Sequence, residues 1–272
     1  MPHETTKNAA GALDVAVLVS VGRHPVTGRT RRADQDARAV EAALTLNKAH
    51  VRLIHAGRHE TDSETALRGY LGMGFEGLTL IEQTRDADVL PALTSTLREA
   101  PPRLLLCGTR AETGEGSGLL PYLLAESLGW PIVTGLAEIE RIEPEHVTLL
   151  QALPRGQRRR LRVRLPAVIT VDEAAPAPRQ SAFGPARRGR LVVSEQVSRP
   201  DAALAGWTLE PARPRPKRLK VVKAASARDR FKAAAAKAEG GGGQVLTDAT
   251  PEQGAEAIVK LLQDEGVLRR LL

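Results

Sequence analysis

The chain has 272 residues and a mass of 29.2 kDa, enough for one sizeable α/β domain with an appendage. It carries a formal net charge of +7, 3% aromatic residues and one cysteine, Cys107, which excludes an internal disulfide. No run of about 18 apolar residues predicts a membrane span, and the polar first residues lack the apolar segment of a secretory signal. We therefore expect a cytoplasmic protein with no membrane partner.

The excess of Lys and Arg raises nucleic acid as a partner, because clustered cations bind phosphates. The scarcity of aromatic residues leaves few stacking platforms, and the sequence has no zinc-finger or basic-zipper pattern. These features disfavour nucleic acid, and an acidic protein surface is the better partner for this charge.

The first half of the chain alternates short apolar runs with helical patterns. The apolar runs predict strands at Asp14–Val21, Val51–His55, Leu78–Ile81 and Leu104–Cys107. Apolar residues at helical spacing predict helices at Asp34–Asn47, Ser63–Tyr70, Asp86–Glu99 and Leu119–Leu128, and we expect Gly22 to Arg32 to form a loop. This alternation is typical of βαβ units and predicts an α/β fold with a parallel sheet.

After Pro131 the pattern changes to longer β-like runs. Ile132–Ile142 and Val147–Leu153 predict a hairpin, and Arg160–Val171 alternates basic and apolar residues. The arginines of this region indicate either a solvated sheet edge or a contact with a protein or anion. A Pro-rich loop with one large apolar residue, Phe183, precedes a further strand at Leu191–Val193.

The composition shifts again near residue 200, which divides the chain into an α/β nucleotide-binding domain, residues 1–200, and a linker with a C-terminal arm, residues 201–272. Within the arm we expect an Ala/Lys helix at Arg228–Glu239, a flexible break at Gly240–Gly243 and an amphipathic helix at Pro251–Leu262. Because such an arm cannot bury its apolar side alone, it folds back on the domain or wraps around a partner.

A glycine-rich stretch from Gly108 to Gly118 lies between the predicted strand at Leu104–Cys107 and the helix that follows. Backbone N–H groups of such a loop, with the helix N-terminus, favour phosphate binding. The stretch matches neither the Walker pattern nor the dinucleotide fingerprint, so a flexible crossover loop stays open as the alternative.

No set of catalytic residues emerges. His55 and His59 share no helix face and have no third ligand nearby, so we expect no metal site. Ser117 is not in the nucleophile elbow pattern, and Glu112 and Glu115 could serve as acid or base, although exposed loop carboxylates usually do neither. We expect a protein without turnover of its own.

Four segments resemble the beta subunit of electron transfer flavoproteins. They are the strand end Leu105 to Ala111, the acidic glycine-rich loop, the helix that ends at Leu128-Gly129-Trp130-Pro131, and the strand Leu165-Pro166-Ala167-Val168-Ile169-Thr170. The resemblance covers Asp14 to Val193 and, more loosely, the arm. It implies a doubly wound, Rossmann-like parallel sheet with an added antiparallel hairpin, and an arm that embraces an alpha subunit.

In that family the beta subunit binds AMP structurally, while the alpha subunit carries most of the FAD. The heterodimer passes electrons from flavin-dependent dehydrogenases to a quinone oxidoreductase. The resemblance implies the same partners and cofactors here. Two alternatives stay open: a basic nucleotide-sensing or nucleic-acid-binding protein of the same fold, and an ATP-consuming enzyme of the same sheet class.

The resemblance also implies the AMP contacts, with the phosphate on backbone N–H groups and on the hydroxyl of Thr113 or Ser117. Carried over, the contacts fall at Ser20, Ala33, Asp34, Gln35, Asp36, Ala56, Gly108, Thr109, Arg110, Ala111, Glu112, Thr113, Gly114, Glu115, Gly116 and Ser117. Gly108, Ala111 and Gly114 match the family motif. The chain departs from it at Val21-Gly22, Ala33-Asp34, Thr113 and Gly116-Ser117.

Phe183 corresponds to the region by which the family's beta subunit docks its dehydrogenase. A single exposed aromatic residue supplies much of the area of a docking anchor. The alternative is that Phe183 packs beneath its own loop.

Overall fold

The computed structural model describes residues 13–264 except 115, 172, 209, 211–225, 227 and 229–245. The chain forms two compact units, Met1–Thr208 and Leu209–Leu272. None of the described helices is long and apolar enough to cross a membrane.

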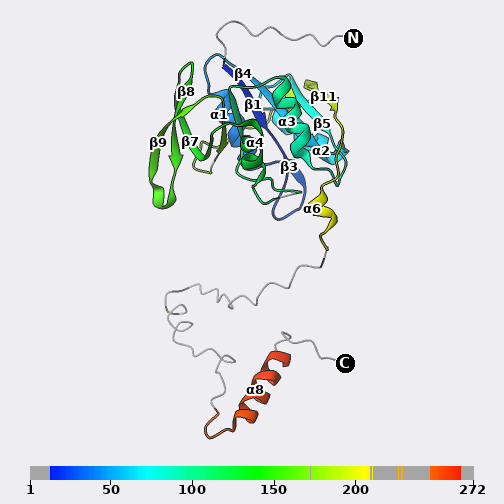
Figure 1. Ribbon diagram of the computed structural model, residues 1–272, viewed down its shortest axis with the longest axis vertical. Helices are drawn as coiled ribbons and strands as arrows, with labels where there is room; N and C mark the ends of the chain where they lie inside the picture. The colour runs from blue at the N-terminus through cyan, green and yellow to red at the C-terminus, as the bar shows by residue number, and fades with distance from the viewer. Residues whose placement is uncertain are drawn as a thin grey trace. The chain divides into compact units, whose positions relative to one another are not determined.

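Within the described part of the first unit, nine strands form one sheet in the order β11-β5-β4-β1-β6-β10-β7-β8-β9 (Figure 1). Their bounds are β1 Leu13–Leu18, β4 Ala49–Gly57, β5 Gly77–Glu82, β6 Leu104–Gly108, β7 Ile132–Ile142, β8 His146–Ala152, β9 Arg158–Arg164, β10 Ala167–Val171 and β11 Arg190–Glu195. Neighbouring strands from β11 to β7 run parallel, and β8 and β9 continue the sheet antiparallel as a ribbon. The predicted α/β class with a mainly parallel sheet is confirmed.

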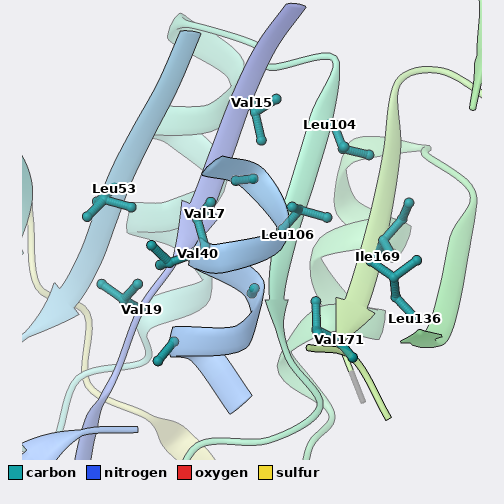
Figure 2. Packing of buried hydrophobic residues seen from close by; sticks show 14 of the residues in the cluster. Val15, Val17, Val19, Val40, Leu53, Leu104, Leu106, Leu136, Ile169 and Val171 are labelled. Atoms are coloured by element: carbon teal, nitrogen blue, oxygen red, sulfur yellow. The ribbon is translucent and has the colours of Figure 1, made fainter. Parts of the chain in front are cut away.

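Helices cover both faces of this sheet. The helices of the unit are α1 Asp34–Leu44, α2 Thr61–Leu71, α3 Val89–Glu99, α4 Leu120–Leu128, α5 Phe183–Arg188 and α6 Ala202–Ala205. One buried cluster joins α1 and α2 to Val15, Val17 and Leu106, and Figure 2 shows such side chains gathered around Val40 of α1. The second cluster joins α3 and α4 to the alternate residues of the same strands, among them Ala16 and Leu105. Both faces of the central strands are therefore buried, which explains their continuous apolar runs.

Two sequence expectations are corrected at strand level. The segment expected as a loop from Gly22 to Arg32 contains an antiparallel pair, β2 Val21–Arg23 and β3 Thr30–Arg32. The alternating stretch Arg160–Val171 is two strands, β9 and β10, with a cis peptide bond at Leu165–Pro166 between them. β10 enters the middle of the parallel sheet between β6 and β7, where all five of its residues are buried and all except Thr170 are apolar.

The Pro-rich loop before β11 is also shorter than expected, because α5 begins at Phe183. The first unit continues past residue 200: Asp88 N–H donates to Arg199 O, and Asp201 N–H donates to Asp86 O, each over 2.8 Å. Residues 199–201 thus bind the segment that leads into α3.

The second unit contains α8 Pro251–Asp264, close to the amphipathic helix expected at Pro251–Leu262. Its apolar residues Ile258, Val259 and Leu261 are exposed within the described residues. The expected Gly240–Gly243 break and all of the expected Arg228–Glu239 helix except Arg228 lie outside the described residues. The role of this unit as an arm stays a prediction.

Candidate nucleotide-binding edge

The candidate site lies where the strand order reverses. From β1 the chain passes through α1 to β4 and then β5 on one side of the sheet, and later returns to β6 on the other side of β1. The loops that follow β1 and β6 therefore meet at the carboxyl edge, which is the usual ligand position in open α/β sheets. Hydrogen bonds join Ser20, residues 33–36 and residues 108–112 at this edge, and their role as AMP contacts stays a prediction.

Asp36 is the centre of this edge. It lies in the first turn of α1, and its side chain is 5% exposed. The N–H and the hydroxyl of Ser20 donate to its Oδ2 over 2.8 and 2.5 Å, and Gly108 N–H donates to its Oδ1 over 2.8 Å. A Cβ on Gly108 would lie 2.5 Å from that Oδ1, so only glycine permits this approach. The carboxyl of Asp36 thus joins the ends of β1 and β6.

Burial raises the pKa of Asp36 to about 6, while the hydrogen bonds from Ser20 and Gly108 act in the opposite direction. The nearby charge of Glu112 adds to the rise. At neutral pH the group is mostly ionised, and the edge carries negative charge before any ligand binds.

Two further side chains complete the inner part of the edge. Gln35 Oε1 accepts from the N–H of Thr109 over 3.0 Å and also from the Thr109 hydroxyl. The hydroxyl of Tyr70 accepts from Ala33 N–H over 2.7 Å and donates to Ser20 O over 2.8 Å. The backbone at 20, 33, 108 and 109 is therefore hydrogen-bonded within the chain.

Glu112 occupies the outer part of the edge. One of its carboxylate oxygens accepts from Arg23 N–H over 2.9 Å, and the other accepts from Asp34 N–H over 3.0 Å. The guanidinium of Arg31 forms an ion pair with the same carboxylate over 3.1 Å. A Cβ on Gly22 would lie 2.7 Å from Glu112 Oε2, so this contact also requires glycine. The side chain of Glu112 thus joins the β6–α4 loop to β2, β3 and α1.

The remaining loop residues differ in what surrounds them. Thr113 donates its hydroxyl to Val21 O over 2.6 Å, and Ser117 accepts from Leu119 N–H over 3.0 Å. Gly114 has a φ of 75°, and a Cβ there would meet nothing within 4 Å. Arg110 and Gly116 are exposed, Ala111 is half-buried, and Glu115 lies outside the described residues. The outer half of the loop therefore has free space that the inner half lacks.

The other expected contacts are more distant from this network or serve different roles. Ala56 lies near the end of β4 and packs with the α3–α4 cluster. Its neighbour His55 is buried, and its Nδ1 lies 2.8 Å from Val19 O, which assigns the ring proton to Nδ1. Burial lowers the pKa of His55, so the ring is neutral at physiological pH. His55 fixes the end of β1.

Phe183 is not part of this edge. It is 80% exposed, so it does not pack beneath its own loop. Ala182 N–H donates to Gly72 O over 2.8 Å, which places the start of α5 beside the end of α2. None of the hydrogen bonds described for the Gly108–Ser117 loop involves Phe183.

Sequence reasoning missed four residues that hold this edge: Gly22, Arg23, Arg31 and Tyr70. Gly22 follows the first predicted strand, which was a signal for a close approach. No local signal identified Tyr70, because its partners are 50 and 37 residues away in the chain. Arg23 contributes only a backbone N–H, which any residue except proline supplies.

Comparison with known proteins shows which family the chain is similar to. Residues 26–198 match the model of the electron transfer flavoprotein domain. The chain is 69% identical over 258 residues to a Chromohalobacter salexigens protein named electron transfer flavoprotein subunit beta, covering 95% of this chain and 97% of that protein. The chain belongs to the electron transfer flavoprotein family. The resemblance seen in the four sequence segments is confirmed.

A more distant member of the flavoprotein family shows how far the similarity extends. The Escherichia coli K12 protein YgcR, provisionally named as an electron transfer flavoprotein subunit, is 35% identical over 114 residues. That match covers 39% of this chain and 42% of YgcR. Family membership therefore rests on the first relative and on the domain match.

The family implies AMP, and the geometry tests whether this edge fits its phosphate. The N–H groups of Gly108, Thr109 and Asp34 each donate already to a side chain of the same chain. The Thr113 hydroxyl donates to a backbone oxygen, and two carboxylates face the region. The inner half of the edge does not fit a phosphate as it stands.

Proposed function

We propose that this chain is the beta subunit of an electron transfer flavoprotein heterodimer whose alpha subunit holds most of the FAD. The observation that carries the proposal is the 69% identity to a protein of that name across 95% of this chain. Electron transfer is the role of the family, and this subunit acts as a carrier without turnover of its own. Flavin-dependent dehydrogenases supply the electrons and a quinone oxidoreductase accepts them.

The proposal includes the fold details that the family implies. The first unit is a doubly wound, Rossmann-like nucleotide fold with an added hairpin, and the second unit is an arm that embraces the alpha subunit. The exposed apolar residues of α8 support this, because apolar surface left in water costs roughly 25 cal/mol per Å². A single cysteine supports a reducing, cytoplasmic location.

AMP at the Gly108–Ser117 loop stays a prediction from the resemblance. The hydrogen bonds of Asp36, Gln35 and Glu112 oppose it, because they occupy the donors that a phosphate needs. Nucleic acid as the alternative partner has no observation in its favour beyond the net charge of +7.

Co-expression with an alpha-type subunit tests the function. We expect a yellow complex with one copy of each chain, reduced by a flavin-dependent dehydrogenase and reoxidised by a quinone oxidoreductase. A colourless chain that stays alone and binds DNA strongly would contradict the proposal. Truncation after Thr208 should leave the first unit cooperatively folded and weaken the heterodimer.

Phe183 gives a sharper test of dehydrogenase docking. Phe183→Ala should slow electron transfer from the dehydrogenase while the flavin content and the heterodimer stay unchanged. Val197→Ala is the matched control, because Val197 is also about 80% exposed but lies in another segment. Equal effects of both variants would remove Phe183 as the anchor.

A further inference from the structure

We propose that Glu112 is a built-in anion that stands where the nucleotide phosphate would bind, so this subunit folds and pairs without AMP. We call the contact set of Glu112 with Arg23, Arg31 and Asp34 the Glu112 clamp. The inference goes beyond the proposed function, which does not depend on whether AMP is present.

The first argument is the start of α1. The residue at its N-cap is Ala33, whose side chain offers no acceptor to the free N–H groups of the first turn. Glu112, 78 residues further along the chain, supplies the acceptor for Asp34 N–H. A carboxylate at a helix N-terminus makes the same interaction with the helix dipole that a phosphate makes. The position of the anion is thus filled by a side chain of the protein.

The second argument is that the clamp joins three segments. Glu112 accepts from the backbone of β2 at Arg23, pairs with Arg31 on β3, and binds the start of α1. β2 and β3 pair with each other at Gly22↔Arg31. A bound phosphate would have to supply these contacts if Glu112 were absent. With Glu112 present, a side chain of the protein itself holds the β2–β3 hairpin against the start of α1, and no bound ligand is needed for this.

The third argument is charge. Asp36 is buried close enough to Glu112 for the charge of Glu112 to raise its pKa, and it is mostly ionised at neutral pH. A phosphate entering this edge would meet the carboxylates of both Asp36 and Glu112, and Coulomb repulsion is strongest at Asp36, from which water is excluded. The hydrogen bonds of Asp36 to Ser20 and Gly108 leave those inner donors unavailable. Both carboxylates therefore exclude the ligand that the family site would hold.

The fourth argument concerns the hydrogen-bond donors and the positive charge that would lose their partner if Glu112 were removed. The freed groups are two backbone N–H donors, the helix N-terminus and the guanidinium of Arg31, whose Nε has no hydrogen-bond partner among the described residues. This set is chemically an anion site. A variant without the carboxylate should therefore gain affinity for phosphate.

The test is anion rescue of Glu112→Ala in the full-length chain, measured as melting temperature in phosphate, in AMP, and in chloride of equal ionic strength. We expect the variant to melt below wild type in chloride and to recover at least half of that loss in phosphate or AMP. We expect it to bind phosphate at least about tenfold more tightly than wild type. Glu112→Gln, which keeps one oxygen, should show a smaller loss and a smaller recovery.

Glu41→Ala is the matched control. Glu41 lies on α1, and its carboxylate, like that of Glu112, accepts from backbone N–H and from a guanidinium, here both of Arg179. Its loss should lower the melting temperature without recovery in phosphate or AMP. Equal recovery of both variants, or recovery of neither, would overturn the inference.

A second measurement addresses the natural complex. Nucleotides released by heat from the purified heterodimer should include FAD and AMP in an amount far below one per FAD, because the carboxylates of Asp36 and Glu112 oppose the phosphate. One AMP per FAD would overturn the inference while leaving the proposed function intact. Failure to obtain a yellow heterodimer would contradict the proposed function, and the anion-rescue result would still decide the inference.

Discussion

The carboxyl edge of the sheet and the β7–β9 ribbon use the same chemistry in different surroundings. At the carboxyl edge, Asp36 accepts hydrogen bonds from Ser20 and Gly108 while it is almost completely buried. On the ribbon, Glu140 accepts two hydrogen bonds over 2.7 and 2.9 Å from Arg160, whose side chain is largely exposed to water. Water screens and competes for the second pair but not for the first. The same kind of bond therefore determines stability at one place and contributes little at the other.

The two regions also differ in what the contacts connect. The contacts of Asp36 and Glu112 join residues more than 70 positions apart, from the β6–α4 loop to α1. The contact of Glu140 with Arg160 on the ribbon joins β7 to β9 across β8, between residues 20 positions apart, and the backbone already holds these strands through β8. Loss of a contact at the carboxyl edge should therefore release loops, whereas loss on the ribbon should not.

The largest expected effect is the pH dependence of the unfolding free energy that Asp36 causes at the carboxyl edge. The folded chain binds the Asp36 proton more tightly than the unfolded chain, because the pKa is about 6 in the folded state against an ordinary value of 3.8. As the pH rises from about 4 to about 6, the free energy of unfolding should fall by about 3 kcal/mol through this group alone. Urea unfolding at several pH values measures it. Asp36→Asn should flatten that fall, and an equal slope in the variant would show that another group is responsible.

Gly108→Ala should cost about 2 kcal/mol of unfolding free energy, because the new Cβ would displace Asp36 and break its bond to Gly108 N–H. Gly116→Ala is the control in the same loop, where the nearest atom would lie at an ordinary 3.4 Å. Thermal and urea unfolding compare the two. Equal losses would mean that the loop, and not the approach of Asp36, sets the cost.

Ser20→Ala should cost about 1 kcal/mol, since one hydrogen bond to the Asp36 carboxyl is lost while the backbone N–H of residue 20 still donates. The hydroxyl lowers the pKa of Asp36, so its removal should also move the midpoint of the pH dependence upward. A stability loss without a shifted midpoint would place the effect in packing alone.

The smallest expected effect is on the ribbon. Glu140→Ala removes an exposed ion pair with Arg160, and the melting temperature should not change measurably at physiological salt. The measurement is a melting curve recorded beside that of Ser20→Ala. A drop as large as that of Ser20→Ala would contradict the contrast between the two regions.

Much of the candidate site could be located from the sequence, but its chemistry could not. The run Leu104–Cys107 and the glycines after it identified the strand and the loop, because burial and turn chemistry are local signals. The same residues suggested an anion site, since glycine-rich loops before helices usually bind phosphate. That Glu112 binds Asp34 and Arg23 depends on how two loops meet in space, which no spacing in the chain records.

By itself, the sequence determined the α/β class, the boundaries of most strands and helices to within a few residues, and the family, because periodicity, turn residues and segment order are written along the chain. Tertiary structure decided the rest. It placed β10 inside the parallel sheet, made an antiparallel pair of the expected loop at 22–32, and exposed Phe183 at the start of α5. It also turned Asp36 and Glu112 toward donors from distant segments. Hydrogen bonds and burial depend on distance in space, and only the folded chain sets that distance.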